Sequence, residues 1–164
     1  MKIETSWISK SAGNKRTGFF EDKDNFSNLP KEKIKSICAF CYCDGKFVIV
    51  KNTSNILRNW EPVSGHIEQG ESPEEALVRE VQEESNMKVL KHFPLGYLYI
   101  REVDIYQVQY LCLVEPYGPF ISDPDGGVTE IKLVDYSEMA EYFDKNDTSR
   151  LTLTRCKEVL DKVL

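Results

Sequence analysis

The chain has 164 residues, of which 41% are apolar and 29% charged, and its net charge at pH 7 is −6. This length fits one domain with a sizeable core, and the composition is ordinary for a soluble globular protein. The acidic balance argues against polymeric DNA or RNA as a partner, since proteins that bind a nucleic acid backbone carry a basic excess. It permits a small phosphorylated, nucleotide-like ligand bound through a divalent metal ion.

The apolar runs and the N-terminus bear on location. No apolar run is long enough to cross a bilayer, and residues 1–20 lack the apolar core and the cleavage site of a signal peptide. The sequence therefore predicts a cytoplasmic protein that does not contact membranes, present as a monomer or a homodimer.

Residues 1–33 are polar and weakly periodic, and we interpret them as an N-terminal arm with one strand, ahead of a main domain at 34–164. Ser36 to Cys43 and Lys46 to Lys51 are rich in β-forming residues and flank an Asp44-Gly45 turn signal, which predicts a hairpin. A polar loop at 51–59 and a short extended piece at 60–63 follow.

The first strand of this hairpin contains a C-x-x-C pair, Cys38 and Cys41, among five cysteines in all. No second pair stands at zinc-finger spacing, and the chain has only two histidines. Residues three apart on a strand face opposite sides of the sheet. We therefore interpret the cysteines as reduced core residues and not as metal ligands.

A helix is predicted from Ser72 to Ser85. Ser72 suits the N-cap position, Pro73 the first helical position, and Glu75 completes a capping box. Asn86 suits the left-handed position that follows a helix.

The second half of the chain predicts further strands at 89–102, 105–114 and 128–134, with a turn near Val103-Asp104 and a turn-rich stretch at 116–127. Helices are expected at 137–143 and 151–164, the last with an apolar stripe that includes Leu153 and Leu160. The elements together predict an α/β (α+β) fold, with a mixed sheet and helices on its faces.

The most informative stretch is Gly65 to Met87: Gly65, five residues, Glu71, seven residues, Arg79-Glu80-Val81, one residue, Glu83-Glu84, one residue, Asn86-Met87. On a helix, Glu80, Glu83 and Glu84 fall on one face beside the apolar arc, whereas carboxylates that serve only solubility would lie on the far face. Three such carboxylates repel one another unless a cation intervenes, and a set of oxygen ligands suits Mg²⁺, with Mn²⁺ as a substitute.

This stretch resembles the Nudix box, G-x5-E-x7-R-E-U-x-E-E-x-G-U with U apolar, and it departs only at Asn86, where the box has glycine. The resemblance implies an α/β/α sandwich with the Nudix loop-helix-loop at 65–87, and hydrolysis of a phosphoanhydride bond in a nucleoside-diphosphate-type molecule. It implies that the metal is bound by Glu80, Glu83, Glu84 and the carbonyl of Gly65, and that Glu71 and Arg79 orient these ligands.

The general base is open at this point. The resemblance favours Glu84 or Glu83, and Glu130, on the strand at 128–134, is a candidate outside the box that would otherwise be an exposed strand residue. Three residues are candidates for substrate binding. Trp60 would stack on a base or pack in the core, Glu68 would lie near the phosphates or their metals, and His66 would contact a phosphate or lie exposed.

The segment Trp60 to Glu71 is similar to that of nucleoside-triphosphate and dihydroneopterin-triphosphate pyrophosphatases of the family. The favoured substrate is therefore a (deoxy)nucleoside triphosphate or a related triphosphate, cleaved to monophosphate and pyrophosphate. ADP-ribose and dinucleoside polyphosphates are alternatives. Four tyrosines at alternating strand positions line the pocket or pack in the core: Tyr97, Tyr99, Tyr106 and Tyr110.

Other classes of function remain alternatives. A non-catalytic Nudix-fold domain that senses a nucleotide would usually lack box glutamates, and all are present here. An isomerase of this fold would need a pocket cysteine, for which Cys112 or Cys41 would have to serve. An enzyme acting on RNA 5′ ends is disfavoured by the acidic charge.

Overall fold

The computed structural model describes residues 1–9, 12–53, 60–120, 126–143 and 147–164. Within them, the strands form one nine-stranded sheet in the order β1-β2-β7-β8-β3-β4-β5, with β6 paired to β3 and β9 paired to β4. The β3–β8 pair is parallel and the other pairs are antiparallel, so the sheet is mixed, as predicted. The strands are β1 (Lys2–Ile8), β2 (Lys15–Asp22), β3 (Ile34–Cys43), β4 (Lys46–Asn52), β5 (Trp60–Glu61), β6 (Val63–His66), β7 (Met87–Ile100), β8 (Ile105–Pro116) and β9 (Val128–Val134).

The hairpin between β3 and β4 turns at Asp44 and Gly45, which both have positive φ, 49° and 81°. Two such residues in succession match the twist of the flanking strands, so this predicted hairpin is confirmed. The turn predicted between β7 and β8 is also confirmed, with Asp104 at φ 53°.

The N-terminal arm differs from its prediction. It contains two strands where we expected one, followed by a short 3-10 helix at Lys31–Lys33. β1 pairs with β2, and β2 pairs with β7 from Gly18↔Ile100 to Asp22↔Gly96, so the arm extends the central sheet. Each arm strand alternates in exposure but has few fully buried residues, which is why its periodicity was weak.

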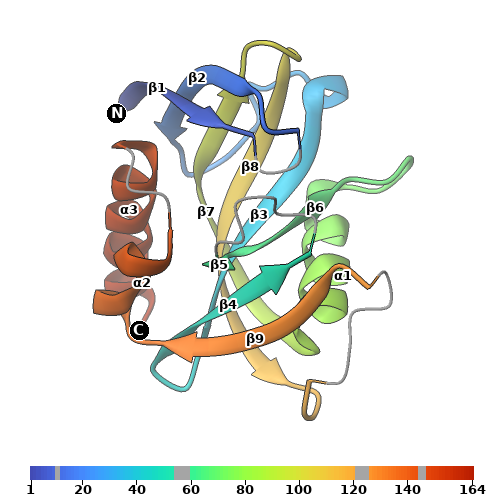
Figure 1. Cartoon of the computed structure of the whole chain (residues 1–164), viewed down its shortest axis with the longest axis vertical. Helices are drawn as coiled ribbons and strands as arrows, with labels where there is room; N and C mark the ends of the chain where they lie inside the picture. Colours follow the sequence, from blue (N-terminus) through green and yellow to red (C-terminus); the bar gives the residue numbers. More distant parts are fainter. Residues whose placement is uncertain (10–11, 54–59, 121–125, 144–146) are drawn as a thin grey trace.

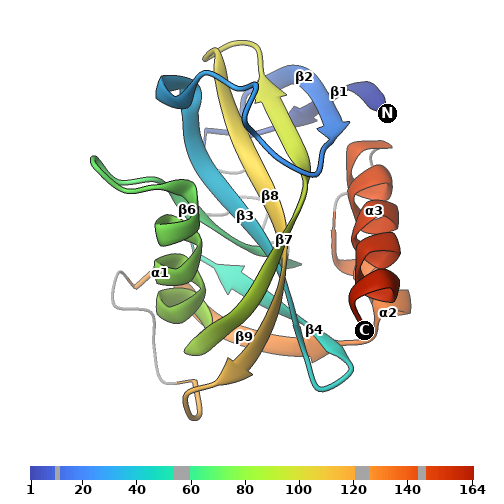
Figure 2. The ribbon, with the colours of Figure 1, turned by 180° about the vertical axis from the view of Figure 1, so that it is seen from behind.

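The two faces of the sheet carry different helices (Figures 1 and 2). Helix α1 (Pro73–Ser85) covers one face, where Ala76, Leu77 and Val81 are fully buried in a core cluster with strand residues. Helices α2 (Tyr136–Tyr142) and α3 (Asp147–Val163) cover the other face, where Leu153, Cys156 and Leu160 belong to a second cluster. The predicted α/β/α arrangement is therefore confirmed. Helix α3 begins at Asp147, four residues before its predicted start.

The cysteines are free and buried, and Cys38 and Cys41 lie in the two different core clusters. Residues three apart thus face opposite sides of the sheet, and the core interpretation is confirmed. Cys41 and Cys112 are neighbours across β3 and β8, both without solvent exposure, so neither is a pocket cysteine of the kind that the isomerase alternative requires.

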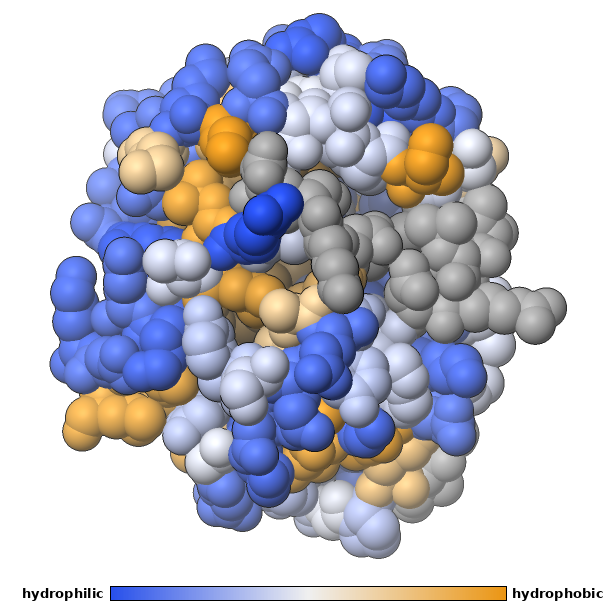
Figure 3. Space-filling model, turned by 60° about the vertical axis from the view of Figure 1, so that its left-hand side comes forward, coloured by the Kyte–Doolittle hydropathy of each residue, from blue (hydrophilic) through white to orange (hydrophobic). Residues whose placement is uncertain are grey.

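The face of the molecule drawn in Figure 3 is mainly polar. On the face drawn in Figure 3, apart from the residues in grey, apolar residues form separate patches within a hydrophilic surround. Among the described residues, none of the helices has the length and apolar character needed to span a bilayer. The predicted loops at 51–59 and 116–127 lie partly outside the described residues, which omit 54–59 and 121–125.

Candidate active site

The loop and helix that follow β6 hold the carboxylates in place. Ser72 accepts a hydrogen bond from the Glu75 N–H at 3.1 Å, which caps the first turn of α1, and Pro73 is its first residue. At the other end Asn86 has φ 54°, the left-handed conformation, and its N–H donates to the Gln82 carbonyl. The departure from glycine at this position therefore preserves the helix end.

The carboxylate of Glu80 lies directly against Gly65 of β6. A Cβ atom at Gly65 would lie 2.1 Å from Glu80 Cδ and 2.2 Å from Oε1, closer than real atoms approach. A side chain at this position would therefore push the Glu80 carboxylate away from its observed place. The contact brings an α1 carboxylate beside the main chain of the loop that begins at Gly65.

Arg79 organises the loop and the helix face. Its Nε and Nη2 donate to the two carboxylate oxygens of Glu71, at 2.8 and 3.0 Å, in a bidentate pair. Nη2 also donates to the His66 carbonyl at 3.0 Å, and Nη1 donates to Glu80 at 2.8 Å and to Glu83 at 3.2 Å. One guanidinium thus connects the loop to two of the three predicted metal ligands.

Glu71 and Glu84 complete the framework. Glu71 accepts a further hydrogen bond from the Glu68 N–H at 3.0 Å, which shapes the loop ahead of the helix. The carboxylate of Glu84 is 3.4 Å from the N–H of Ser64, on β6. Glu80 and Glu84 are only 9% and 5% exposed, whereas carboxylates that serve solubility alone would be fully exposed.

Glu71 and Arg79 each shift the pKa of the other. The Arg79 guanidinium holds the pKa of the Glu71 carboxyl below its usual value, and the carboxylates around Arg79, Glu71 first among them, raise the pKa of the guanidinium. Both groups therefore stay charged at neutral pH.

The donor set suits a hard divalent cation. Glu80, Glu83, Glu84 and the nearby Gly65 carbonyl offer only oxygen, the ligand type that Mg²⁺ and Mn²⁺ take. In the part of the chain that is described, no three acidic, cysteine or histidine side chains are already gathered for metal binding. Arg79 Nη1 instead bonds both Glu80 and Glu83. The residues present fit the ion, and the side chains would turn from Arg79 to reach it.

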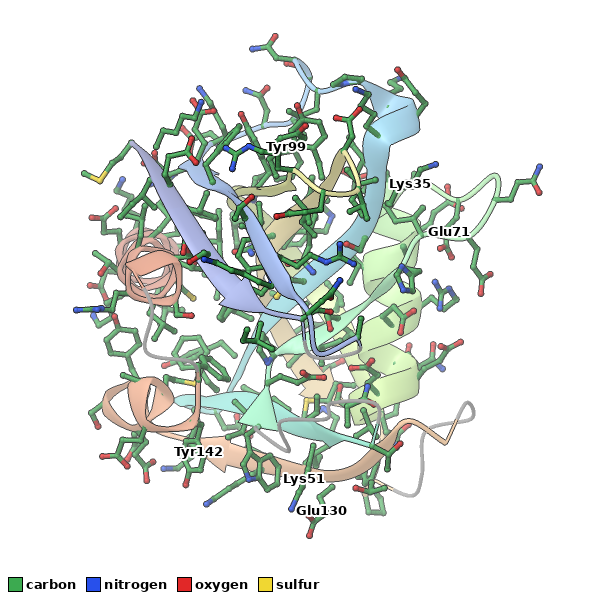
Figure 4. The ribbon with its side chains drawn as sticks, turned by 45° about the horizontal axis from the view of Figure 1, so that its top comes forward. Lys35, Lys51, Glu71, Tyr99, Glu130 and Tyr142 are labelled. Carbon is green, nitrogen blue, oxygen red and sulfur yellow. The ribbon has the colours of Figure 1, made fainter. Side chains whose placement is uncertain are left out.

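Two of the predicted site residues lie in another part of the sheet. Trp60 and Glu130 are register partners of Lys51, on either side of β4. Trp60 packs against Tyr142 with ring centroids 6.4 Å apart, and Glu130, with a 59% exposed side chain, is 3.7 Å from Lys51. Figure 4 shows Glu130 and Lys51 together, well apart from Glu71. The structure does not join either residue to the box carboxylates.

Other predicted residues lie closer to the box. His66 contributes its carbonyl to Arg79 and has an exposed side chain, and Glu68 lies 3.9 Å from Arg79 Nη1. Tyr110 is buried and donates to Glu74, in the first turn of α1, at 3.1 Å. Tyr106 packs against both Tyr97 and Tyr99, with ring centroids 5.4 and 5.0 Å apart. All four tyrosines therefore take part in packing.

The model of the NUDIX domain family matches residues 33–155, well over half of the chain. The chain belongs to the Nudix family. The prediction of a Nudix hydrolase is thus confirmed at the level of the family. No curated protein matches the chain in sequence.

Solved Nudix structures share the fold. The Bacillus subtilis pyrophosphohydrolase BsRppH (an E68A mutant) is 18% identical, with a TM-score of 0.69 over 87% of this chain and 92% of that one. MutT, from a study of Aliivibrio salmonicida and Vibrio cholerae, is 19% identical, with a TM-score of 0.59 over 77% and 98%. A Caenorhabditis elegans Ap4A hydrolase is 18% identical, with a TM-score of 0.59 over 78% and 99%.

Sequence reasoning missed the main-chain groups that position the Nudix carboxylates. The Ser64 N–H lies against Glu84, and the Ile67 N–H donates to the Lys35 carbonyl at 2.9 Å, which ties the loop to β3. Main-chain donors leave no mark in the sequence, because every residue except proline has one. Only the short extended piece predicted at 60–63 could have indicated that a strand would present such groups here.

Proposed function

We propose that this Nudix protein hydrolyses a phosphoanhydride bond of a small nucleoside-diphosphate-type substrate with Mg²⁺ as its cofactor and Mn²⁺ as a substitute. The observation that carries the proposal is the contact of Glu80 with Gly65, fixed by the Arg79 network and flanked by Glu83 and Glu84. This arrangement supports a site for a metal-bound pyrophosphate beside β6, at the face of α1 that carries these carboxylates.

Glu80, Glu83, Glu84 and the Gly65 carbonyl would hold the metal. When bound, the ion would neutralise charge on the phosphate oxygens. Arg79 and Glu71 act as positioning residues, because they touch the ligands and the loop and orient both. Of the neighbouring groups, His66 and Glu68 are the candidates for contact with the phosphates, and Trp60 remains a candidate for contact with the base.

The reaction is attack of water on phosphorus. The new bond joins the water oxygen to phosphorus, the bond from phosphorus to the bridging oxygen breaks, and the bridging oxygen leaves with the other phosphate group. Glu84 or Glu83 accepts the proton of the water as general base. The burial of Glu84 beside Ser64 favours it over Glu130, which pairs with Lys51 in another part of the sheet.

The favoured substrate is a (deoxy)nucleoside triphosphate or a similar triphosphate, on the likeness of Trp60 to Glu71 to pyrophosphatases of this kind. A dinucleoside polyphosphate is the second candidate, because an Ap4A hydrolase is among the structures of the same fold. The reaction is the same for both, and only the group beyond the cleaved bond differs.

The test is a panel of dNTPs, dihydroneopterin triphosphate, ADP-ribose, Ap4A and NADH with Mg²⁺, with release of phosphate and pyrophosphate measured. We expect metal-dependent turnover that is lost in Glu83→Gln and kept in Glu75→Gln, whose carboxylate is exposed on α1. Absence of turnover, with intact folding and Mg²⁺-dependent nucleotide binding, would instead indicate a nucleotide sensor.

A further inference from the structure

Two glutamines interrupt an apolar row of β8. Alternate residues of a strand face the same side, so Gln107, Gln109, Leu111 and Leu113 lie on one face of β8. Leu111 belongs to the core cluster under α3, which places both glutamines on the α3 face of the sheet. A strand that serves only the core would continue with apolar residues.

Gln109 is buried but incompletely hydrogen-bonded. It is 6% exposed, its Nε2 is 3.3 Å from Gln107 Oε1, and its Oε1 has no partner among the described residues. Thr148 Oγ1, in the first turn of α3 on the same face, is also buried without a partner there. Arg155 Nε, also on α3, is the third such atom among the described residues. Buried polar groups are nearly always satisfied, so the Gln109 oxygen points to a ligand or ordered water that completes it.

The strand register connects these glutamines to the Nudix carboxylates. Gln109 pairs with Cys38, and Cys38 pairs with Ser64, whose N–H lies against Glu84. Residues paired in this way point to the same face, as Phe40 and Leu111 do in the core cluster. Ser64 and Gln109 are thus two strand spacings apart, about 10 Å.

A second row runs parallel to the first. Gln107 pairs with Ser36, and Ser36 pairs with His66, whose carbonyl is bound by Arg79. The α3 face therefore carries a polar patch, made up of Ser36, Ser64, His66, Gln107 and Gln109, that reaches from β8 to the edge strand β6. The carboxylates belong to α1 on the opposite face, and they meet this patch at the main chain of the edge strand β6, where the Ser64 N–H lies against Glu84. A nucleotide with its phosphates at the carboxylates would pass round that edge to reach the patch.

We propose that this patch binds the nucleobase of the substrate, with the Gln107 and Gln109 amides hydrogen-bonding to the edge of the base. An amide offers a donor and an acceptor side by side, which matches the adjacent donors and acceptors on a base edge. The bond from Gln109 to Gln107 fixes how the two amides present these groups. This assignment rests on the proposed function, since it places the base of the same substrate.

The test uses Gln107→Met and Gln109→Met, which keep the side-chain length and remove the amide. Gln82→Met, an exposed glutamine of α1, is the matched control. We expect kcat/KM for the preferred dNTP to fall about tenfold in each patch variant, the effect of one hydrogen bond, with the ratio between the four dNTPs moving towards one. The control should keep the wild-type ratio.

The melting temperature of the variants distinguishes base binding by Gln109 from a purely structural role. Because Gln109 is incompletely satisfied, Gln109→Met should melt at the same temperature as the wild type or higher, whereas a glutamine needed for folding would lower the melting temperature. Base preference unchanged in both folded variants would overturn the assignment.

If the wild type turns over no nucleotide, the proposed function fails. The patch is then judged by calorimetry with AMP, GMP, CMP and UMP, in which binding by the wild type and loss in the variants are expected, and equal or absent binding overturns it.

Discussion

The carboxylate of Glu80 occupies the space that a side chain at Gly65 would need. The virtual Cβ of Gly65 falls 2.1 Å from Glu80 Cδ and 2.6 Å from the farther carboxylate oxygen. The Nudix-box glycine and the glutamate fifteen residues later are therefore coupled by contact, and a side chain at position 65 would displace the Glu80 carboxylate.

Gly65→Ala should displace the Glu80 carboxylate. We expect Mg²⁺ affinity or kcat to fall by about 10–100-fold, as for other groups that position metal ligands, with a loss of about 1–3 kcal/mol in stability from the overpacked contact. Metal titration of activity and urea denaturation measure the two effects. Gly118→Ala is the control, because a Cβ there meets its nearest atom at an ordinary 3.9 Å. Wild-type metal affinity in Gly65→Ala would contradict the role of this contact.

Arg79→Lys keeps the charge but cannot reproduce the bidentate pair with Glu71 or the simultaneous bonds to His66 and Glu80. We expect kcat to fall about 10–100-fold. In a double-mutant cycle with Glu71→Gln, the two losses should be far from additive, since both changes break one network. Additive losses would show that Arg79 acts on the carboxylates independently of Glu71.

Acid should weaken the contribution of Glu71 to stability. Its pKa is lowered in the folded protein from 4.5, first of all by the hydrogen bonds from Arg79. The unfolded state therefore binds a proton at higher pH than the folded state. The pair stabilises the fold above about pH 4.5, and this contribution is lost as the pH falls through the lower folded-state value.

The measurement is urea denaturation of the wild type and Glu71→Gln from about pH 7 to about pH 3. The difference between their unfolding free energies should be constant near neutrality and shrink below about pH 4.5. Glu75→Gln, on the exposed side of α1, is the matched control. A difference that grows on acidification would reverse the sign and refute the argument.

Comparison of Glu84→Gln with Glu130→Gln tests whether the general base lies in the Nudix box or on β9. We expect kcat to fall about 10²–10⁴-fold for Glu84→Gln, the usual contribution of a general base. Glu130→Gln should remain within about twofold of the wild type, because its pair with Lys51 is exposed and contributes little. The opposite ranking would move the base to β9, and Glu83→Gln in the same series covers the remaining box candidate.

Helix ends and tight turns could be predicted from the sequence, because they depend on residues that are close together in the chain. The cap residues Ser72 and Asn86 defined α1 closely, and the spacing of its glutamates placed Glu80 and Glu84 at the buried edge, as observed. The positive-φ pair at Asp44 and Gly45 likewise follows from a turn signal two residues long.

Long-range pairings could not be predicted in this way. β2 pairs with β7, about eighty residues later in the chain. Gly18 allows this approach because it has no Cβ atom, which would lie 1.8 Å from the Tyr99 carbonyl oxygen. Trp60 and Glu130 carried no signal that they meet at Lys51. The glutamines of β8 did break an apolar alternation, but which face they lie on depends on the register with β3.

The pairing of β2 with β7 has a consequence for self-association. A chain shortened by its first 22 residues would leave Gly96–Ile100 with unpaired N–H and C=O groups, a template for strands of other molecules. In the intact chain the outermost strand is β1, whose exposed face carries Lys2 and Glu4. Charges at such a position oppose edge-to-edge addition, so the N-terminal hairpin protects the sheet against polymerisation as well as widening it.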